Sequence, residues 1–256
     1  MIVSLIHLLL IASLCAPLGG CATTEPKATG EGIGKLSAQE ADSPADLYVA
    51  LAAEYYRIGQ LDAALDRATR AVETDKSNGR AHYVMGIVLQ RLGEQGMAEK
   101  HFEQAIELEP SNPDIRNAWG AFLCGQGRHA EADEQFAKAL ANPLFATPAL
   151  ALTNAGLCAM SAGNEAKGEE YLRQALSRDP GFAPALYQMA ELNYERRNYK
   201  TAHDYIERLL RAAPVAPKSL ALAIRVEKAL GNRKQATAYT KYLRQSFPDA
   251  PELMQL

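Results

Sequence analysis

The sequence predicts an all-α protein made of about six helical hairpins stacked end to end, and three observations support this fold class. First, the stretch 79–110 has small residues, Gly86 and Ala98, at points where two helices must approach closely. Second, Gly93 permits a turn between those helices, and Pro110 ends the second one. Third, the same residue types recur after a shift of about 34 residues, which is the test for an internal repeat. Such an array buries its core between neighbouring units.

The recurrence covers most of the chain. The matching positions are Ala52, Gly59, Ala64 and Ala71 upstream, then Gly120, Gly127, Ala132, Phe136 and Ala139, then Gly156, Gly163, Ala175 and Pro180, then Ala190, Tyr199, Ala202 and Pro214, and finally Gly231, Ala236 and Pro248. A short slip in the spacing falls at 142–148. This pattern resembles the tetratricopeptide repeat. The resemblance implies a superhelix, or α-solenoid, over residues 43–256, in which the first helix of each hairpin lines the inner surface.

Composition and motifs argue against several classes of function. Apolar residues are 48% and charged residues 22%, and the net charge of −3 provides no broad basic field for nucleic acid. The chain has no GxSxG or Walker A motif. His82, His101, His129 and His203 fall on different expected helices without metal-ligating spacing. His82 and His129 fall where the repeat usually has an aromatic residue, so we expect them to pack. We therefore expect no enzyme, cofactor, metal, small-molecule substrate or nucleic-acid partner.

Residues 1–20 are predicted to be a lipoprotein signal peptide. The apolar run 2–14 is too short to span a bilayer as a mature helix. The segment 18–21, Leu-Gly-Gly-Cys, resembles a bacterial lipobox, which implies that Cys21 becomes the first mature residue and carries acyl chains such as palmitate. Several chains give stable anchoring, and Ala22 implies sorting to the outer membrane. An ordinary cleaved signal followed by an unmodified cysteine is the alternative.

Residues 21–42 are predicted to be a flexible tether between the lipid and the folded body. Most of this segment is Thr, Glu, Pro, Lys, Gly and Ser, with few apolar residues. The first repeat helix is then expected to begin at Ser43 and Pro44, because serine is a favourable cap and proline a favourable first helical residue.

Two cysteines remain for the folded body, Cys124 and Cys158. Both are expected on the inner helices of adjacent repeats, and exported proteins meet an oxidising compartment in which neighbouring cysteines tend to pair. A disulfide here would join the third repeat to the fourth and would contribute roughly 3 to 4 kcal/mol in the chain-entropy model. Two small buried thiols are the alternative.

Residues on the first helices of the hairpins predict a surface for a protein partner. The expected groove consists of Tyr55, Tyr56, Tyr83, Ile87, Leu157, Tyr187 and Tyr194. A tyrosine can bury its ring against a partner while its hydroxyl stays in water. Each of these residues taken singly also fits packing between repeats. Tyr55, Tyr56 and Tyr83 form the best local cluster, so the first two repeats are the expected docking surface.

The third and fourth repeats indicate a narrower family. The runs 117–124 (Asn-Ala-Trp-Gly-Ala-Phe-Leu-Cys) and 154–159 (Asn-Ala-Gly-Leu-Cys-Ala), with Asn142 and Pro143 between them, resemble type IV pilus biogenesis and stability lipoproteins, the pilotins of the pilus secretin. This resemblance implies a lipid-anchored protein on the periplasmic face of the outer membrane. There it would bind the secretin subunit, with other pilus assembly proteins as further partners, and promote secretin localisation and multimerisation for pilus biogenesis and twitching motility. A general periplasmic adaptor for cell-wall or outer-membrane assembly machinery is the alternative, and it would leave pili intact.

Overall fold

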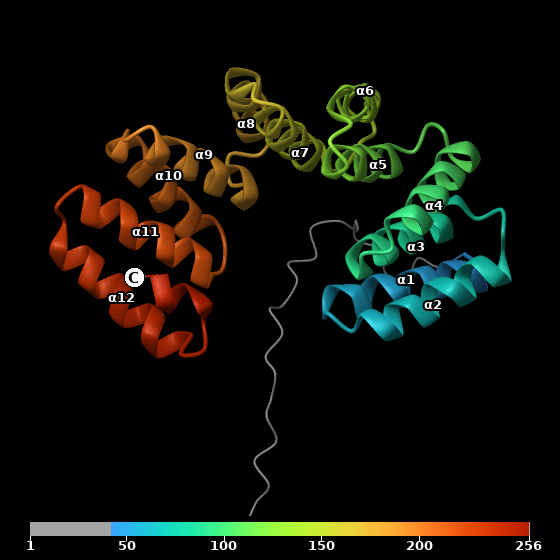
Figure 1. Ribbon diagram of the computed structural model, residues 1–256, viewed down its shortest axis with the longest axis horizontal. Coiled ribbons are helices and arrows are strands. Elements are labelled where there is room, and N and C mark those ends of the chain that lie inside the picture. Colours follow the sequence, from blue (N-terminus) through green and yellow to red (C-terminus); the bar gives the residue numbers. More distant parts are fainter. Residues whose placement is uncertain (1–41, 256) are drawn as a thin grey trace, which may run out of the picture.

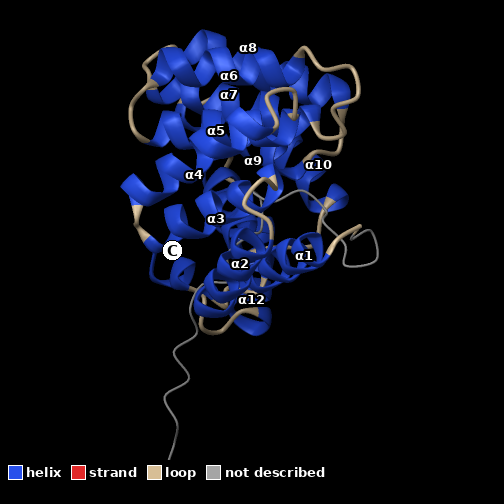
Figure 2. Ribbon diagram, turned by 90° about the vertical axis from the view of Figure 1, so that its right-hand side faces the viewer, coloured by secondary structure: helices blue, strands red, loops and turns tan. Residues whose placement is uncertain are grey.

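The computed structural model describes residues 42–255 and folds them into six helical hairpins in a row. In chain order these are α1 (Pro44–Arg57) with α2 (Leu61–Thr74), α3 (Gly79–Leu92) with α4 (Gln95–Leu108), α5 (Pro113–Gly125) with α6 (His129–Leu140), α7 (Pro148–Ser161) with α8 (Glu165–Arg178), α9 (Ala183–Glu195) with α10 (Tyr199–Ala212), and α11 (Pro217–Ala229) with α12 (Arg233–Ser246). A short 3₁₀ helix, η2 (Pro251–Gln255), follows. Figure 2 shows helices joined by loops, and no strand occurs within 42–255. The predicted all-α repeat fold is therefore confirmed. The predicted signal peptide and all but residue 42 of the predicted tether lie outside the described residues.

The ends of the helices follow from local chemistry. The Ser43 side chain accepts a hydrogen bond from the backbone N–H of Asp46, and Pro44 is the first residue of α1. The turns inside the hairpins need a left-handed backbone, and Gly93 supplies it at φ +86° between α3 and α4. In the fifth hairpin Arg197 takes this conformation at φ +60°, which is costly for a residue with a side chain.

Small residues allow the two helices of a hairpin to touch. A Cβ atom added at Gly86 would lie 3.2 Å from the ring of Phe102, and one added at Gly120 would lie 2.8 Å from the ring of Phe136. Both rings are fully buried, with exposures of 0% and 1%. Each phenylalanine ring thus occupies the space that a side chain at the facing glycine would need.

The array curves because its inner helices are closer together than its outer ones. Consecutive odd-numbered helices, from α1 to α11, pack against one another, whereas consecutive even-numbered helices show no comparable contact within the described residues. Figure 1 shows the resulting arch, with α5 and α7 on its inner side and α6 and α8 on its outer side. None of the helices in residues 42–255 is both long and apolar enough to cross a bilayer.

Candidate functional site

Two residues of the predicted groove are buried and do not face a partner. Tyr83 and Ile87 on α3 are each only 4% exposed, and both belong to a hydrophobic core that extends from the first repeat into the fourth. The prediction that Tyr83 anchors a docking surface on the first two repeats is therefore wrong. Its position in the repeat places it on an inner helix, but its side chain is buried in the core that the repeats share.

Tyr55 and Tyr56 at the end of α1 are half-buried against the same core. Burial raises the pKa of the Tyr56 hydroxyl, and the nearby Arg91 guanidinium partly opposes that rise. Part of each tyrosine side chain thus remains exposed to solvent at the N-terminal end of the array.

The C-terminal half of the groove is a connected set of aromatic and charged side chains, which we call the inner-face cluster: Tyr187, Glu191 and Tyr194 of α9 and Arg225 of α11. The Tyr187 hydroxyl donates to Oε1 of Glu191 over 3.3 Å. The Arg225 guanidinium lies 3.8 Å from the same carboxylate and 5.2 Å from the ring centroid of Tyr194. Burial and the Glu191 carboxylate raise the pKa of Tyr187 to about 12, so its hydroxyl stays neutral and able to donate.

Leu157 extends this surface onto the neighbouring inner helix. It is 38% exposed on α7, and α7 packs against α9. The structure therefore brings Leu157, Tyr187 and Tyr194 onto adjacent inner helices, α7 and α9, and leaves Tyr55 and Tyr56 at the other end of the arch.

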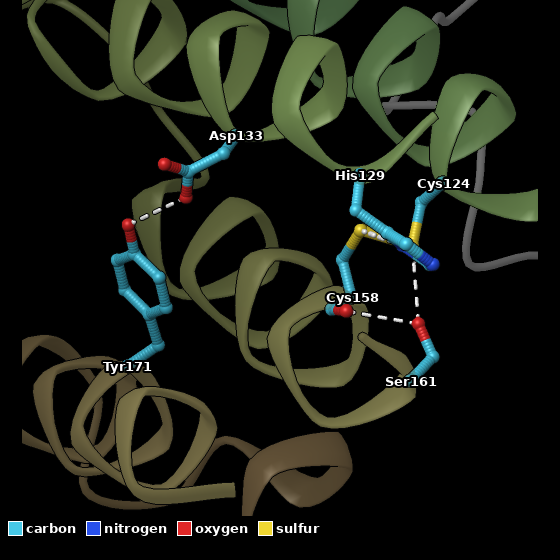
Figure 3. The surroundings of a disulfide bond; sticks show 6 residues. All are labelled: Cys124, His129, Asp133, Cys158, Ser161 and Tyr171. Atoms are coloured by element: carbon cyan, nitrogen blue, oxygen red, sulfur yellow. Dashed lines mark hydrogen bonds between the residues drawn. A yellow bond between two sulfur atoms is a disulfide. The ribbon is translucent and has the colours of Figure 1, made fainter. Parts of the chain in front are cut away.

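The two cysteines of the repeats meet between the third and fourth hairpins. Cys124 of α5 and Cys158 of α7 form a disulfide in the structure, with their Cα atoms 5.7 Å apart (Figure 3). Cys158 is buried, and Cys124 is half-buried. The bridge links two inner helices across the connection 141–147, where the repeat spacing slips.

A histidine that the repeat pattern assigned to packing lies directly against these sulfur atoms. His129 is the first residue of α6, and its Nδ1 is 3.6 Å from Sγ of Cys158 and 3.8 Å from Sγ of Cys124 (Figure 3). His82, by contrast, fits the packing expectation: its ring lies beside that of His101, with the two Nδ1 atoms 3.0 Å apart. The signal for the His129 contact was its position just across a hairpin turn from Cys124.

A small cavity of about 200 Å³ opens beside the bridge and is lined by His129, Asp133, Phe136, Cys158 and Lys167, among others. The two charged residues that line it, Lys167 and Asp133, form an ion pair with each other. Nζ of Lys167 lies 2.8 Å from a carboxylate oxygen of Asp133, and the Tyr171 hydroxyl donates to the other oxygen over 3.0 Å. The cavity is therefore a mostly apolar space with one neutralised ion pair.

Comparison with known proteins agrees with this geometry. Three models of the tetratricopeptide repeat match residues 79–112, 123–183 and 159–224. The type IV pilus assembly protein PilF of Pseudomonas aeruginosa is 26% identical over 246 residues, which cover 95% of this chain and 94% of PilF.

Two solved structures have the same fold over nearly their whole length. The P. aeruginosa PilF structure superposes with a TM-score of 0.67 at 26% identity and covers 82% of this chain and 95% of its own. The crystal structure of PilW, described as a widely conserved type IV pilus biogenesis factor, superposes with a TM-score of 0.71 at 31% identity and covers 84% of this chain and 99% of its own. Because this similarity extends along the hairpin array, the protein belongs to the tetratricopeptide-repeat family of type IV pilus biogenesis factors.

Proposed function

We propose that this protein is an outer-membrane lipoprotein that binds the type IV pilus secretin subunit and promotes its outer-membrane localisation and assembly into multimers. The observation that carries the proposal is the likeness to PilW, at 31% identity across 99% of that chain. The match spans the hairpins as one array, so it supports a shared fold and a role in type IV pilus biogenesis. The chain would act as an adaptor, holding its partner on the inner surface of the arch.

The partner would bind chiefly on α7, α9 and α11. Leu157 offers exposed apolar surface there, and Tyr187 and Tyr194 offer half-buried rings with polar neighbours already in place. Aromatic side chains held by packing lose little conformational freedom on binding, which makes them good anchors. An extended or helical segment of the secretin with apolar side chains fits this surface.

The membrane address would come from the lipid on Cys21. Two or more acyl chains give stable anchoring, whereas a single chain gives only marginal binding. The segment 22–42 would then be a flexible linker between the anchor and the first hairpin, and its length would set its reach.

The anchor is tested by complementation of a deletion strain. Deletion should abolish secretin multimers in the outer membrane and twitching motility, and the wild-type gene should restore both. A Cys21→Ser variant should fail to incorporate labelled palmitate and should fail to restore multimers. Cys15→Ser is the matched control, because Cys15 lies within the predicted signal peptide, and it should restore both. Normal palmitate labelling of Cys21→Ser would contradict the assigned anchor, and intact secretin multimers after deletion would contradict the secretin role.

The binding surface is tested with two exposed leucines. Leu157 is 38% exposed on α7, and Leu144, at 88%, lies in the loop before it. Leu157→Asp should reduce capture of the secretin from envelope extract, since it places a charge on the proposed surface. Leu144→Asp adds the same charge away from it and should bind as the wild type does. Equal capture by both variants would contradict the assignment of the inner face.

A further inference from the structure

Three metal-ligating side chains converge on one point between the third and fourth repeats. They are Cys124 from α5, Cys158 from α7 and His129 from the start of α6. Figure 3 shows the imidazole ring of His129 lying against the two sulfur atoms. Two thiolates and an imidazole are the donor set that Zn²⁺ prefers in proteins.

The distances to the imidazole are those of a tetrahedral site. With zinc–sulfur bonds of about 2.3 Å and zinc–nitrogen bonds of about 2.0 Å, ligand atoms around one ion lie roughly 3.5 to 3.8 Å apart. Nδ1 of His129 is 3.6 Å from Sγ of Cys158 and 3.8 Å from Sγ of Cys124. Only the two sulfur atoms, which are bonded to each other in the disulfide, need to separate. Rotation of the two cysteine side chains supplies that separation once the bond is cleaved.

A fourth ligand position is also present. Oγ of Ser161 lies 3.7 Å from Sγ of Cys124, and Ser161 is an exposed residue at the end of α7. This hydroxyl donates a hydrogen bond to the Cys158 carbonyl oxygen over 2.8 Å, so a water molecule would complete four-coordination, as at zinc sites with three protein ligands. The position is open on the solvent side, so an ion has a path to the sulfur atoms.

The surrounding charges do not oppose a cation. Lys167, which lines the adjacent cavity, is paired with Asp133, and Arg128, which precedes His129 in the sequence, is paired with Glu131 and Glu99. Holding two thiolates and one divalent ion leaves the site neutral, which suits a location with one buried and one half-buried sulfur.

We propose that the protein binds one Zn²⁺ through Cys124, Cys158 and His129 when the disulfide is reduced. A dithiol reductant transfers two electrons and two protons to the bridge and becomes a disulfide itself, which leaves two cysteine thiols. Zn²⁺ then displaces the two thiol protons and binds both thiolates and the unprotonated Nδ1 of His129. The disulfide and the zinc site use the same sulfur atoms, so they exclude one another. Either one links α5 to α7, so the junction between the two repeats is held in both redox states.

The test uses the purified chain, reduced and then freed of reductant without oxygen, and titrated with Co²⁺ followed by Zn²⁺. Reduced wild-type chain should bind one Co²⁺ with thiolate charge-transfer bands and the visible bands of tetrahedral cobalt, and Zn²⁺ should displace it. The oxidised chain should show neither. Zn²⁺ should also protect the thiols of Cys124 and Cys158 in the reduced wild-type chain from alkylation, a readout that needs no variant.

Two variants separate a three-ligand site from two neighbouring thiols. His129→Ala should weaken Zn²⁺ binding by at least about 10-fold. Loss of a residue that only orients a metal ligand already weakens binding by that factor, and His129 is itself a proposed ligand. His101→Ala, which removes a histidine from another hairpin, should leave the affinity unchanged. The proposal is overturned if reduced wild-type chain with native circular dichroism shows no thiolate–cobalt bands. It is equally overturned if His129→Ala retains wild-type affinity for Zn²⁺.

Discussion

The close contact between α5 and α6 makes a quantitative prediction about Gly120. Replacing this glycine by alanine places a Cβ atom 2.8 Å from one ring atom of Phe136 and 2.9 Å from another. Carbon atoms normally approach to about 3.5 to 4.0 Å. Phe136 is 1% exposed, so its ring has no free space to move into. The two helices must therefore separate, or the ring must leave its preferred rotamer.

The expected cost is the balance of two effects. Overpacking a well-packed core costs about 1 to 3 kcal/mol. Replacing glycine by alanine inside a helix stabilises the folded protein by about 0.5 to 1 kcal/mol. Gly120→Ala should therefore lower the free energy of unfolding by about 1 kcal/mol, and by no more than about 2.5 kcal/mol. Gly86→Ala should cost less, since its Cβ would lie 3.2 Å from the ring of Phe102.

Urea denaturation followed by far-ultraviolet circular dichroism measures these differences. Gly125, in the same helix as Gly120, is the matched control because an added Cβ would meet no atom within 4 Å. Gly125→Ala should be neutral or slightly stabilising. The two residues should also be coupled: Phe136→Leu combined with Gly120→Ala should cost less than the sum of the single changes. If Gly120→Ala is as stable as Gly125→Ala, the close-packing argument is refuted.

Two further predictions concern the bridge and a histidine pair. Replacing both Cys124 and Cys158 by serine should lower the free energy of unfolding by roughly 3 to 4 kcal/mol, as expected for a bridge between residues 34 apart. Urea titration checks this, and a reductant should destabilise the wild type but not the variant. Burial and the neighbouring His82 lower the pKa of His101, so the unfolded chain binds a proton at a higher pH than the folded chain does. Stability should therefore fall as the pH drops from about 7 to 5, and His101→Gln should flatten that dependence in pH-dependent urea titrations. An unchanged slope in the variant would contradict this origin.

Much of the architecture could be predicted because each hairpin is encoded locally. The spacing of Gly86, Gly93 and Phe102 already specifies two helices, the turn between them and the packing of one on the other. The repeat of that spacing specifies the array. Likewise, Ser43 and Pro44 marked the start of α1, since a cap and a first helical residue depend only on their immediate neighbours.

The exposure of the groove residues was less predictable. Tyr83 and Tyr187 both lie on inner helices, yet Tyr83 is 4% exposed, whereas Tyr187 is half-buried with its hydroxyl bonded to Glu191. Whether a ring fills the seam between repeats or lies over it depends on how closely two separate hairpins approach. The periodicity within one hairpin carries no information on that approach.

The sequence by itself therefore determined the helical repeat and the family that it resembles, because these depend on residues close together in the chain. Only the tertiary structure decided which tyrosines remain at the surface and that His129 lies against the sulfur atoms of Cys124 and Cys158. The contact between His129 and Cys158 joins residues of successive hairpins that are 29 positions apart in the sequence. Their distance is set by the angle at which one repeat packs on the next, a property of the assembled array.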